Sequence, residues 1–181
     1  MKKHLKAIAV MVSIMLVCGG LLAILSDLLY VSNEERIQRA INKIYTEEVS
    51  LVKTLDLTTV DTQSFSNYGE IKSCYAIDNG DYLILSTGKN GYSNGTVTLY
   101  VSISVIEGVP TVKNTVQDSY TGQTLMSKLT SLYQRFTGKT ANLEKEEVNE
   151  IVTGATFSSR ATSNAVYCAL QLVTILEGGA L

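Results

Sequence analysis

One segment of the chain gathers the residue types that could hold a phosphate group. It reads Glu150-Ile151-Val152-Thr153-Gly154-Ala155-Thr156-Phe157-Ser158-Ser159 and precedes an apolar, helix-periodic stretch. Gly154 and Ala155 leave the backbone unobstructed, and Ser158 or Ser159 could cap the following helix, whose N-terminal amides favour an anion. The segment is therefore a candidate phosphate site, although hydroxyl residues before a helix usually act only as caps.

The rest of the composition narrows the possible chemistry. The single histidine, His4, precedes the apolar N-terminal run, which excludes His-based triads and His-ligated metal catalysis from the folded domain. Cys18, Cys74 and Cys168 form no Cys-x-x-Cys pair, so a thiolate zinc or iron–sulfur site is not expected. A Cys74–Cys168 disulfide and two buried thiols both remain open, the thiols being the commoner arrangement. Catalysis would need carboxylates, hydroxyls, lysines or a cofactor.

Length and charge set further limits. The 181 residues carry a formal net charge of −2, which offers no basic surface for nucleic acid. The length allows one N-terminal anchor and one domain of roughly 150 residues. The chain has one proline and no low-complexity tract, so no disordered linker is expected.

The N-terminal run Ala7 to Ser26 contains no charged residue. A helix of roughly 20 apolar residues matches the hydrocarbon thickness of a bilayer. We therefore predict a single-pass helix in the cell (inner) membrane, with a cytoplasmic N-terminus and an extracytoplasmic domain. The orientation rests on the charges before and after the run, Lys2, Lys3, Lys6, Asp27, Glu34 and Glu35. A cleaved signal peptide and a lipoprotein attached at Cys18 are the alternatives, but neither has its cleavage-site residues.

An amphipathic helix should connect this anchor to the domain. Ser32-Asn33-Glu34-Glu35 is a capping-box pattern, and apolar residues follow at helical spacing to about Thr46. This divides the chain into a cytoplasmic tip and anchor at 1–30, a connecting helix at 31–48 and a folded domain at 49–181.

The domain pattern predicts strands first and helices afterwards. Between about residues 53 and 115 apolar residues alternate, with a hairpin at Asp78-Asn79-Gly80-Asp81. In the run 95–106 the apolar residues should face the core and the polar residues should face away. Helices are expected at 125–136 and at Arg160–Leu176. Sequential hairpins followed by packed helices indicate an α+β fold with an antiparallel sheet.

The segment Val148–Leu170 resembles the signature of the FMN-binding domain family, which includes the G subunit of the Rnf electron-transport complex and the C subunit of the sodium-translocating NADH:quinone reductase. The shared pattern is an acidic residue, then Ser/Thr-Gly-Ala-Thr, then a hydroxyl-rich helix start with an Arg-Ala pair. Gly91-Tyr92 and Phe136-Thr137-Gly138-Lys139 resemble two further family segments. Two positions depart: Glu150 stands where the family usually has Asp, and Ser119–Thr124 replaces a Glu-Thr-Pro-Gly-Leu-Gly loop, with only Gly122 matching.

The resemblance implies that the domain at 49–181 is an FMN-binding domain. It also implies that a separate, FAD-using flavin transferase joins FMN through its phosphate to the Thr156 hydroxyl. The other cofactor-binding positions that it implies are Glu150, Thr153, Gly154, Ala155, Ser158 and Ser159. No catalytic or metal-ligating residue is expected, because the flavin supplies the redox chemistry.

The implied function is electron transfer within a membrane ion-translocating oxidoreductase, an Rnf-type ferredoxin:NAD oxidoreductase whose other membrane subunits are the partners. The chain would then be an electron-carrying subunit without an independent active site. The alternatives are a free-standing anchored flavoprotein that serves extracellular acceptors and a flavin-free binding domain.

Overall fold

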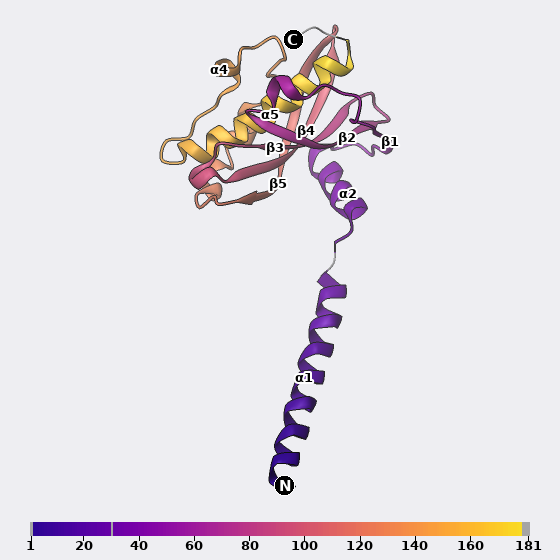
Figure 1. The fold of residues 1–181 in the computed structure, drawn as a ribbon. Coiled ribbons are helices and arrows are strands. Elements are labelled where there is room, and N and C mark those ends of the chain that lie inside the picture. Colours follow the sequence, from indigo (N-terminus) through magenta and orange to yellow (C-terminus); the bar gives the residue numbers. More distant parts are fainter. Residues whose placement is uncertain (1, 30, 179–181) are drawn as a thin grey trace. The chain divides into compact units, whose positions relative to one another are not determined.

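The computed structural model describes residues 2–29 and 31–178, and for residues 2–5, 7, 9 and 27–29 it describes the backbone alone. The described chain falls into two compact units, the first ending at Arg39 and the second beginning at Ala40. Figure 1 traces both units along the chain.

The first unit is helical, but the predicted membrane anchor is contradicted. Helix α1 spans Lys2–Leu29, yet within the described residues no helix is both long and apolar enough to cross a membrane. The predicted transmembrane helix and the predicted single-pass membrane location are therefore wrong for the described residues. The flanking side chains of Lys2, Lys3 and Asp27 lie outside the described residues.

The capped helix predicted after residue 30 is present as α2 (Asn33–Ile44). The Glu35 amide donates to Ser32 Oγ at 3.2 Å, as a Ser N-cap requires. The Glu35 carboxylate bonds Arg39 Nη2 at 2.8 Å. The last turn of α2 belongs to the second unit, where Ile41 and Ile44 are buried.

The second unit is built on a five-stranded antiparallel sheet with strand order β1-β2-β3-β4-β5. The strands are β1 (Leu51–Leu55), β2 (Gly69–Ile77), β3 (Tyr82–Gly88), β4 (Thr96–Ile106) and β5 (Val109–Thr121). Each strand pairs with the next one in the chain, so the sheet is a meander. The predicted Asn-Gly hairpin joins β2 to β3, and Gly80 adopts φ +86° there. The α+β class is confirmed.

Helix α5 (Thr156–Leu176) crosses one face of the sheet, where it packs against β2, β3 and β4 (Figure 1). Ala161, Ala165 and Cys168 on α5 are fully buried, as are Ile84 and Leu99 on the strands. The small side chains let the helix approach the strands closely. Each fully buried Leu or Ile contributes about 1.5–3 kcal/mol by leaving water.

Five shorter helical segments connect these elements. They are η1 (Gln63–Phe65), η2 (Tyr92–Asn94), η3 (Met126–Leu129), α3 (Leu132–Arg135) and α4 (Lys145–Val148). The single helix predicted over 125–136 is therefore wrong, because η3 and α3 are separate. Leu129, Leu132 and Phe136 are still buried, so the apolar spacing predicted burial correctly and continuity incorrectly.

The expectation that β4 buries only one face is also wrong. Thr98, Tyr100 and Ser102, on the face predicted to point away from the core, are buried along with the apolar residues. Their hydroxyls find partners: Thr98 Oγ1 lies 2.9 Å from Thr87 Oγ1, and Ser102 Oγ lies 2.7 Å from the Tyr45 hydroxyl. A buried hydroxyl is tolerated when it is hydrogen-bonded.

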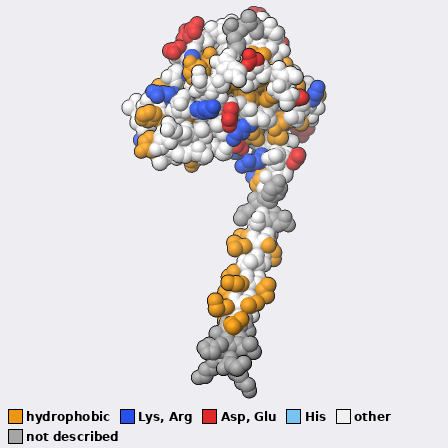
Figure 2. Space-filling view, in the orientation of Figure 1, with side chains coloured by type: hydrophobic (Ala, Val, Ile, Leu, Met, Phe, Trp, Pro, Cys, Tyr) orange, Lys and Arg blue, Asp and Glu red, His pale blue; other side chains and the backbone are white. Residues whose placement is uncertain are grey.

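The second unit contains two cysteines, Cys74 and Cys168, and both are free thiols with no exposed surface. Burial raises the pKa of each thiol to about 12. The buried-thiol interpretation is confirmed, and the disulfide alternative is not. Figure 2 shows acidic and basic side chains interspersed over the face of this unit that it draws.

Candidate functional site

A hollow of about 430 Å³ opens at the N-terminal end of α5. Its wall consists of residues 154–158, together with Thr124 and Leu125 after β5 and Tyr92 in η2. We call it the α5 pocket. Three loops that are far apart in sequence meet here, and one of them is the Thr-Gly-Ala-Thr segment singled out from the sequence.

Thr156 is the first residue of α5, and its side chain is exposed. The N-cap is Ala155, with φ −135° and ψ 32°, and no side chain caps the helix. The first amides of a helix have no intrahelical acceptor, so they are available to an anion at this end. The prediction that Ser158 or Ser159 caps the helix is wrong, since α5 begins before both residues.

The turn that leads into α5 has a cation beside it. Gly154 adopts φ +80°, a left-handed conformation that glycine adopts without strain. A Cβ on Gly154 would lie 3.5 Å from Lys128 Nζ. Lys128 therefore places a positive charge next to the Thr-Gly-Ala-Thr turn, close to the exposed start of the helix.

Ser159 fixes this turn from inside. Its buried hydroxyl donates to the Ala155 carbonyl at 2.9 Å and accepts from the Val152 amide at 3.0 Å. The Ala155 amide in turn donates to the Val152 carbonyl at 2.9 Å. These bonds hold residues 152–155 in one conformation, which places Thr156 at the pocket wall.

Ser158 has a different partner from Ser159. Its hydroxyl donates to Gln123 Oε1 at 2.7 Å, and both side chains are buried. The first turn of α5 is thereby bonded to the loop that follows β5. Ser158 lines the α5 pocket, whereas Ser159 stabilises the turn behind it.

Two aromatic rings stand at the pocket mouth. Tyr92 and Phe157 are 51% and 52% exposed, and their ring centroids lie 6.4 Å apart at an interplanar angle of 64°. The Arg160 guanidinium lies 5.5 Å from the centroid of Phe157. Half-exposed rings of this kind offer faces and edges against which a flat aromatic ligand can pack.

Two of the predicted site residues lie away from the pocket wall. The Glu150 carboxylate pairs with Lys139 Nζ at 3.0 Å and with Arg135 Nη1 at 3.9 Å. Thr153 is exposed but does not line the pocket. The structure thus brings together Gly154, Ala155, Thr156 and Ser158 at the wall, with Ser159 directly behind them.

Sequence reasoning did not identify the residues that reach the pocket from other loops. These are Tyr92, Thr124 and Leu125 in the wall, with Gln123 and Lys128 beside it; Phe157 also lines the pocket, from the first turn of α5 itself. These loops meet because of the pairing between β4 and β5, in which Thr96 lies opposite Thr121. That pairing places the loop before β4 beside the loop after β5, and α5 begins next to both.

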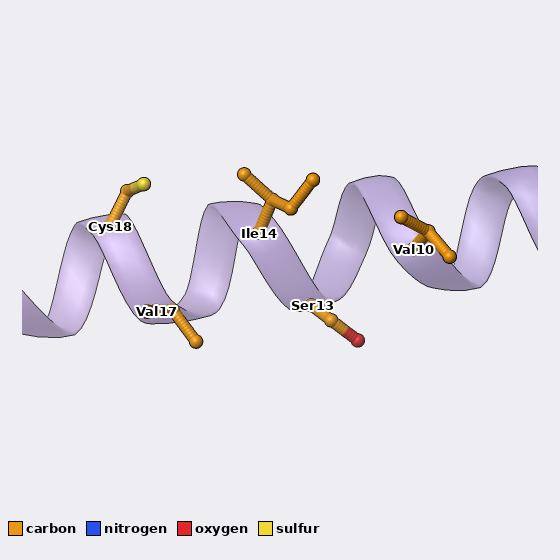
Figure 3. Close-up of a pocket in the computed structure, with 5 residues that line it drawn as sticks. All are labelled: Val10, Ser13, Ile14, Val17 and Cys18. Carbon is orange, nitrogen blue, oxygen red and sulfur yellow. The ribbon is translucent and has the colours of Figure 1, made fainter.

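A second hollow lies on α1 and has no comparable construction. Its lining is Val10, Ser13, Ile14, Val17 and Cys18, which project from a single helix in Figure 3. A groove on one helix offers no convergent polar groups for a ligand. Within the described residues, no group of three or more His, Cys, Asp or Glu side chains could hold a metal ion.

The α5 pocket thus stands on its own geometry: an exposed threonine at an uncapped helix start, a neighbouring lysine and two aromatic rings. No family model matches the chain, and no curated protein or solved structure matches it either.

Proposed function

We propose that this protein is an electron carrier with FMN joined through its phosphate to Thr156. The observation that carries the proposal is the position of Thr156, exposed on the wall of a pocket of about 430 Å³ at an uncapped helix N-terminus. The flavin would supply the redox chemistry when bound. The chain would hold it, orient it and limit its contact with water.

The residues around Thr156 suit a phosphodiester. The uncapped amides of α5 and the helix dipole favour negative charge. Lys128 Nζ supplies a nearby positive charge, and Gly154 has no side chain to intervene. At an exposed site each such charge contributes less than about 1 kcal/mol, so attachment would depend on the covalent bond.

The remaining wall suits a flat, largely apolar ring system. Tyr92, Phe157 and Leu125 supply apolar surface, while Thr124 and Ser158 supply hydroxyls. The volume of about 430 Å³ falls within the usual range for small-molecule pockets, roughly 300–1,000 Å³. We infer that the ring system packs beside Tyr92 and Phe157.

The loading reaction would be a phosphoryl transfer from FAD. Thr156 Oγ1 would be the acceptor: it would form the new bond to the flavin-side phosphorus while the bond to the second phosphate breaks, with AMP as the leaving group. The hydroxyl proton must go to a base, and among the described residues no side chain hydrogen-bonds Thr156. We therefore assign the base and the activation of FAD to a separate flavin transferase, with Thr156 as acceptor.

The resemblance around Thr156 supports a more specific role, as the G-type subunit of an Rnf ion-translocating oxidoreductase. In that role the chain would relay electrons between partner subunits. The two competing roles are a stand-alone flavoprotein and a flavin-free binding domain, and the replaced 119–124 loop favours the second of these. Co-purification of partner redox subunits with the tagged chain would support the Rnf role, and isolation of the flavinylated chain alone would support the stand-alone role.

The decisive test compares three full-length chains, wild type, Thr156→Val and Thr153→Val, each co-expressed with a flavin transferase. Thr153 is the matched control, because it is an exposed threonine in the same turn that does not line the pocket. We expect flavin fluorescence in the denatured band of wild type and Thr153→Val, and none in Thr156→Val. A fluorescent Thr156→Val band would reject Thr156 as acceptor, and three dark bands would favour the flavin-free domain.

A further inference from the structure

The Gln123 side chain makes three hydrogen bonds at the α5 pocket, although it lies behind the pocket wall. Its side chain is 7% exposed. Its Oε1 accepts from the Ser158 hydroxyl at 2.7 Å and from the Tyr92 amide at 3.2 Å, and its Nε2 donates to the Thr121 carbonyl at 3.2 Å. One amide group therefore joins the first turn of α5, segment η2 and the end of β5. We call this set of bonds the Gln123 bridge.

The surrounding backbone is shaped to receive this amide. A Cβ on Gly91 would lie 2.2 Å from Gln123 Nε2, and one on Gly95 would lie 2.6 Å from it. The same Cβ atoms would also meet backbone, the Gly95 carbonyl oxygen at 2.6 Å from Gly91 and the Thr121 carbonyl oxygen at 2.1 Å from Gly95, and backbone cannot move aside as a side chain can. The two glycines thus allow the amide to lie directly against the loop that carries Tyr92, where no other residue type would fit without displacement.

The orientation of the amide follows from its partners. The Tyr92 N–H can only donate, so it requires the amide oxygen, and the Thr121 carbonyl can only accept, so it requires the NH₂ group. A buried amide with both ends satisfied holds a single rotamer, since any rotation would leave buried polar groups without partners. The bridge therefore fixes the distance between Tyr92 and the start of α5.

We propose that Gln123 is a positioning residue for the group bound at Thr156: it keeps the Tyr92 ring at a set separation from Thr156 and Phe157. This inference rests on the proposed function, since the group positioned is the flavin. It assigns a role to the 119–124 loop, in which only Gly122 matches the family pattern. Gln123 does not touch the reacting atoms and acts through Ser158 and the Tyr92 backbone.

The test compares Gln123→Met with Gln117→Met in the full-length, flavin-transferase-treated protein. Methionine keeps the length of the side chain and removes every hydrogen bond. Gln117 is the matched control, because its Oε1 accepts from the Tyr133 hydroxyl at 2.7 Å and it does not line the pocket. Two readouts are needed: amide hydrogen exchange of the peptides 89–95 and 154–160 by mass spectrometry, and fluorescence anisotropy of the attached flavin.

We expect Gln123→Met to speed exchange in both peptides by about tenfold, as the loss of one or two hydrogen bonds implies, and to lower the flavin anisotropy. Gln117→Met should change neither. Ser158→Ala removes one arm of the bridge, so it should loosen 154–160 while leaving 89–95 protected.

The outcomes separate this inference from the proposed function. Unchanged exchange in Gln123→Met would overturn the bridge whether or not flavin is attached. Faster exchange with unchanged anisotropy would overturn its positioning role. Faster exchange in a protein that carries no flavin in its wild-type form would reject the flavin and leave the bridge as a link between three loops.

Discussion

The first turn of α5 (156–159) and the body of the helix (161–173) make different kinds of contact. From Ala161 to Val173 nearly every residue is buried, and the helix packs on the sheet through small and apolar side chains together with hydrogen bonds such as that from Ser86 Oγ to the Ala165 carbonyl. In the first turn Thr156 and Phe157 are exposed, while Ser158 and Ser159 bond to loops rather than to the sheet. The body of the helix determines where α5 lies. The first turn determines what that position can bind.

This difference implies a difference in energetics. Substitutions in the body act on the packed core and should change the free energy of unfolding by several kcal/mol. Substitutions in the first turn act on one or two hydrogen bonds and should cost about 1–2 kcal/mol while changing the pocket.

Gly88→Ala should be the most damaging of these changes, because Gly88 lies on β3 directly under the body of α5. A Cβ at Gly88 would lie 1.9 Å from the Ala161 carbonyl oxygen and 2.5 Å from the Ala165 amide nitrogen, so α5 would have to move off the sheet. We expect a loss of about 3 kcal/mol or more in the free energy of unfolding, measured by denaturant titration.

Gly80→Ala is the control for this prediction. Gly80 has φ +86° and no neighbour within 4 Å of the added Cβ. Its cost should therefore be only the left-handed backbone penalty, about 1–2 kcal/mol. Equal losses in the two variants would show that the approach of α5 to the sheet is not the constraint.

The buried thiol of Cys168 should make the body sensitive to alkaline pH. Burial raises its pKa from 9.0 to about 12. Above pH 9 the unfolded thiol loses its proton while the folded one keeps it, so stability is complete below about pH 9 and falls between pH 9 and 12. We expect Cys168→Ala to fall less steeply than wild type over that window, measured by thermal unfolding at successive pH values. Parallel curves would contradict the assignment.

Ser159→Ala should loosen the turn before α5 without releasing the helix from the sheet. The variant leaves the Val152 amide without its 3.0 Å acceptor, at a cost of about 1–2 kcal/mol. Hydrogen exchange of residues 150–156 should quicken, while exchange in the body of α5 should change little. Equal acceleration of exchange along the whole helix would contradict the proposed difference between the first turn and the body of α5.

Glu150→Gln should have the smallest effect. The carboxylate is partly exposed and pairs with Lys139 and Arg135, so its removal should cost less than about 1 kcal/mol and the difference should shrink in high salt. Because Glu150 lies off the pocket wall, we also expect the variant to be flavinylated as fully as wild type. A large drop in flavin content would return Glu150 to the site as a recognition residue.

Local patterns in the sequence predicted much of the fold. The Asn-Gly turn, the capped helix after residue 30, the strand within 95–106 and the last helix are all determined by neighbouring residues, and each was found. The errors lie where local pattern is ambiguous. Polar residues of β4 are buried because Tyr45 and Thr87 satisfy their hydroxyls, and the helix at 125–136 is divided. The membrane-spanning assignment of the N-terminal run was wrong.

From its sequence alone this protein could be read as an α+β domain with a Thr-Gly-Ala-Thr segment before its last helix, because periodicity and local turn chemistry depend on adjacent residues. Only the tertiary structure decided that this segment forms a pocket. Tyr92, Gln123 and Lys128 reach it from loops distant in sequence, and no spacing rule links those positions to Thr156. They meet because the pairing of β4 with β5 and the packing of α5 on the sheet bring the ends of these elements together.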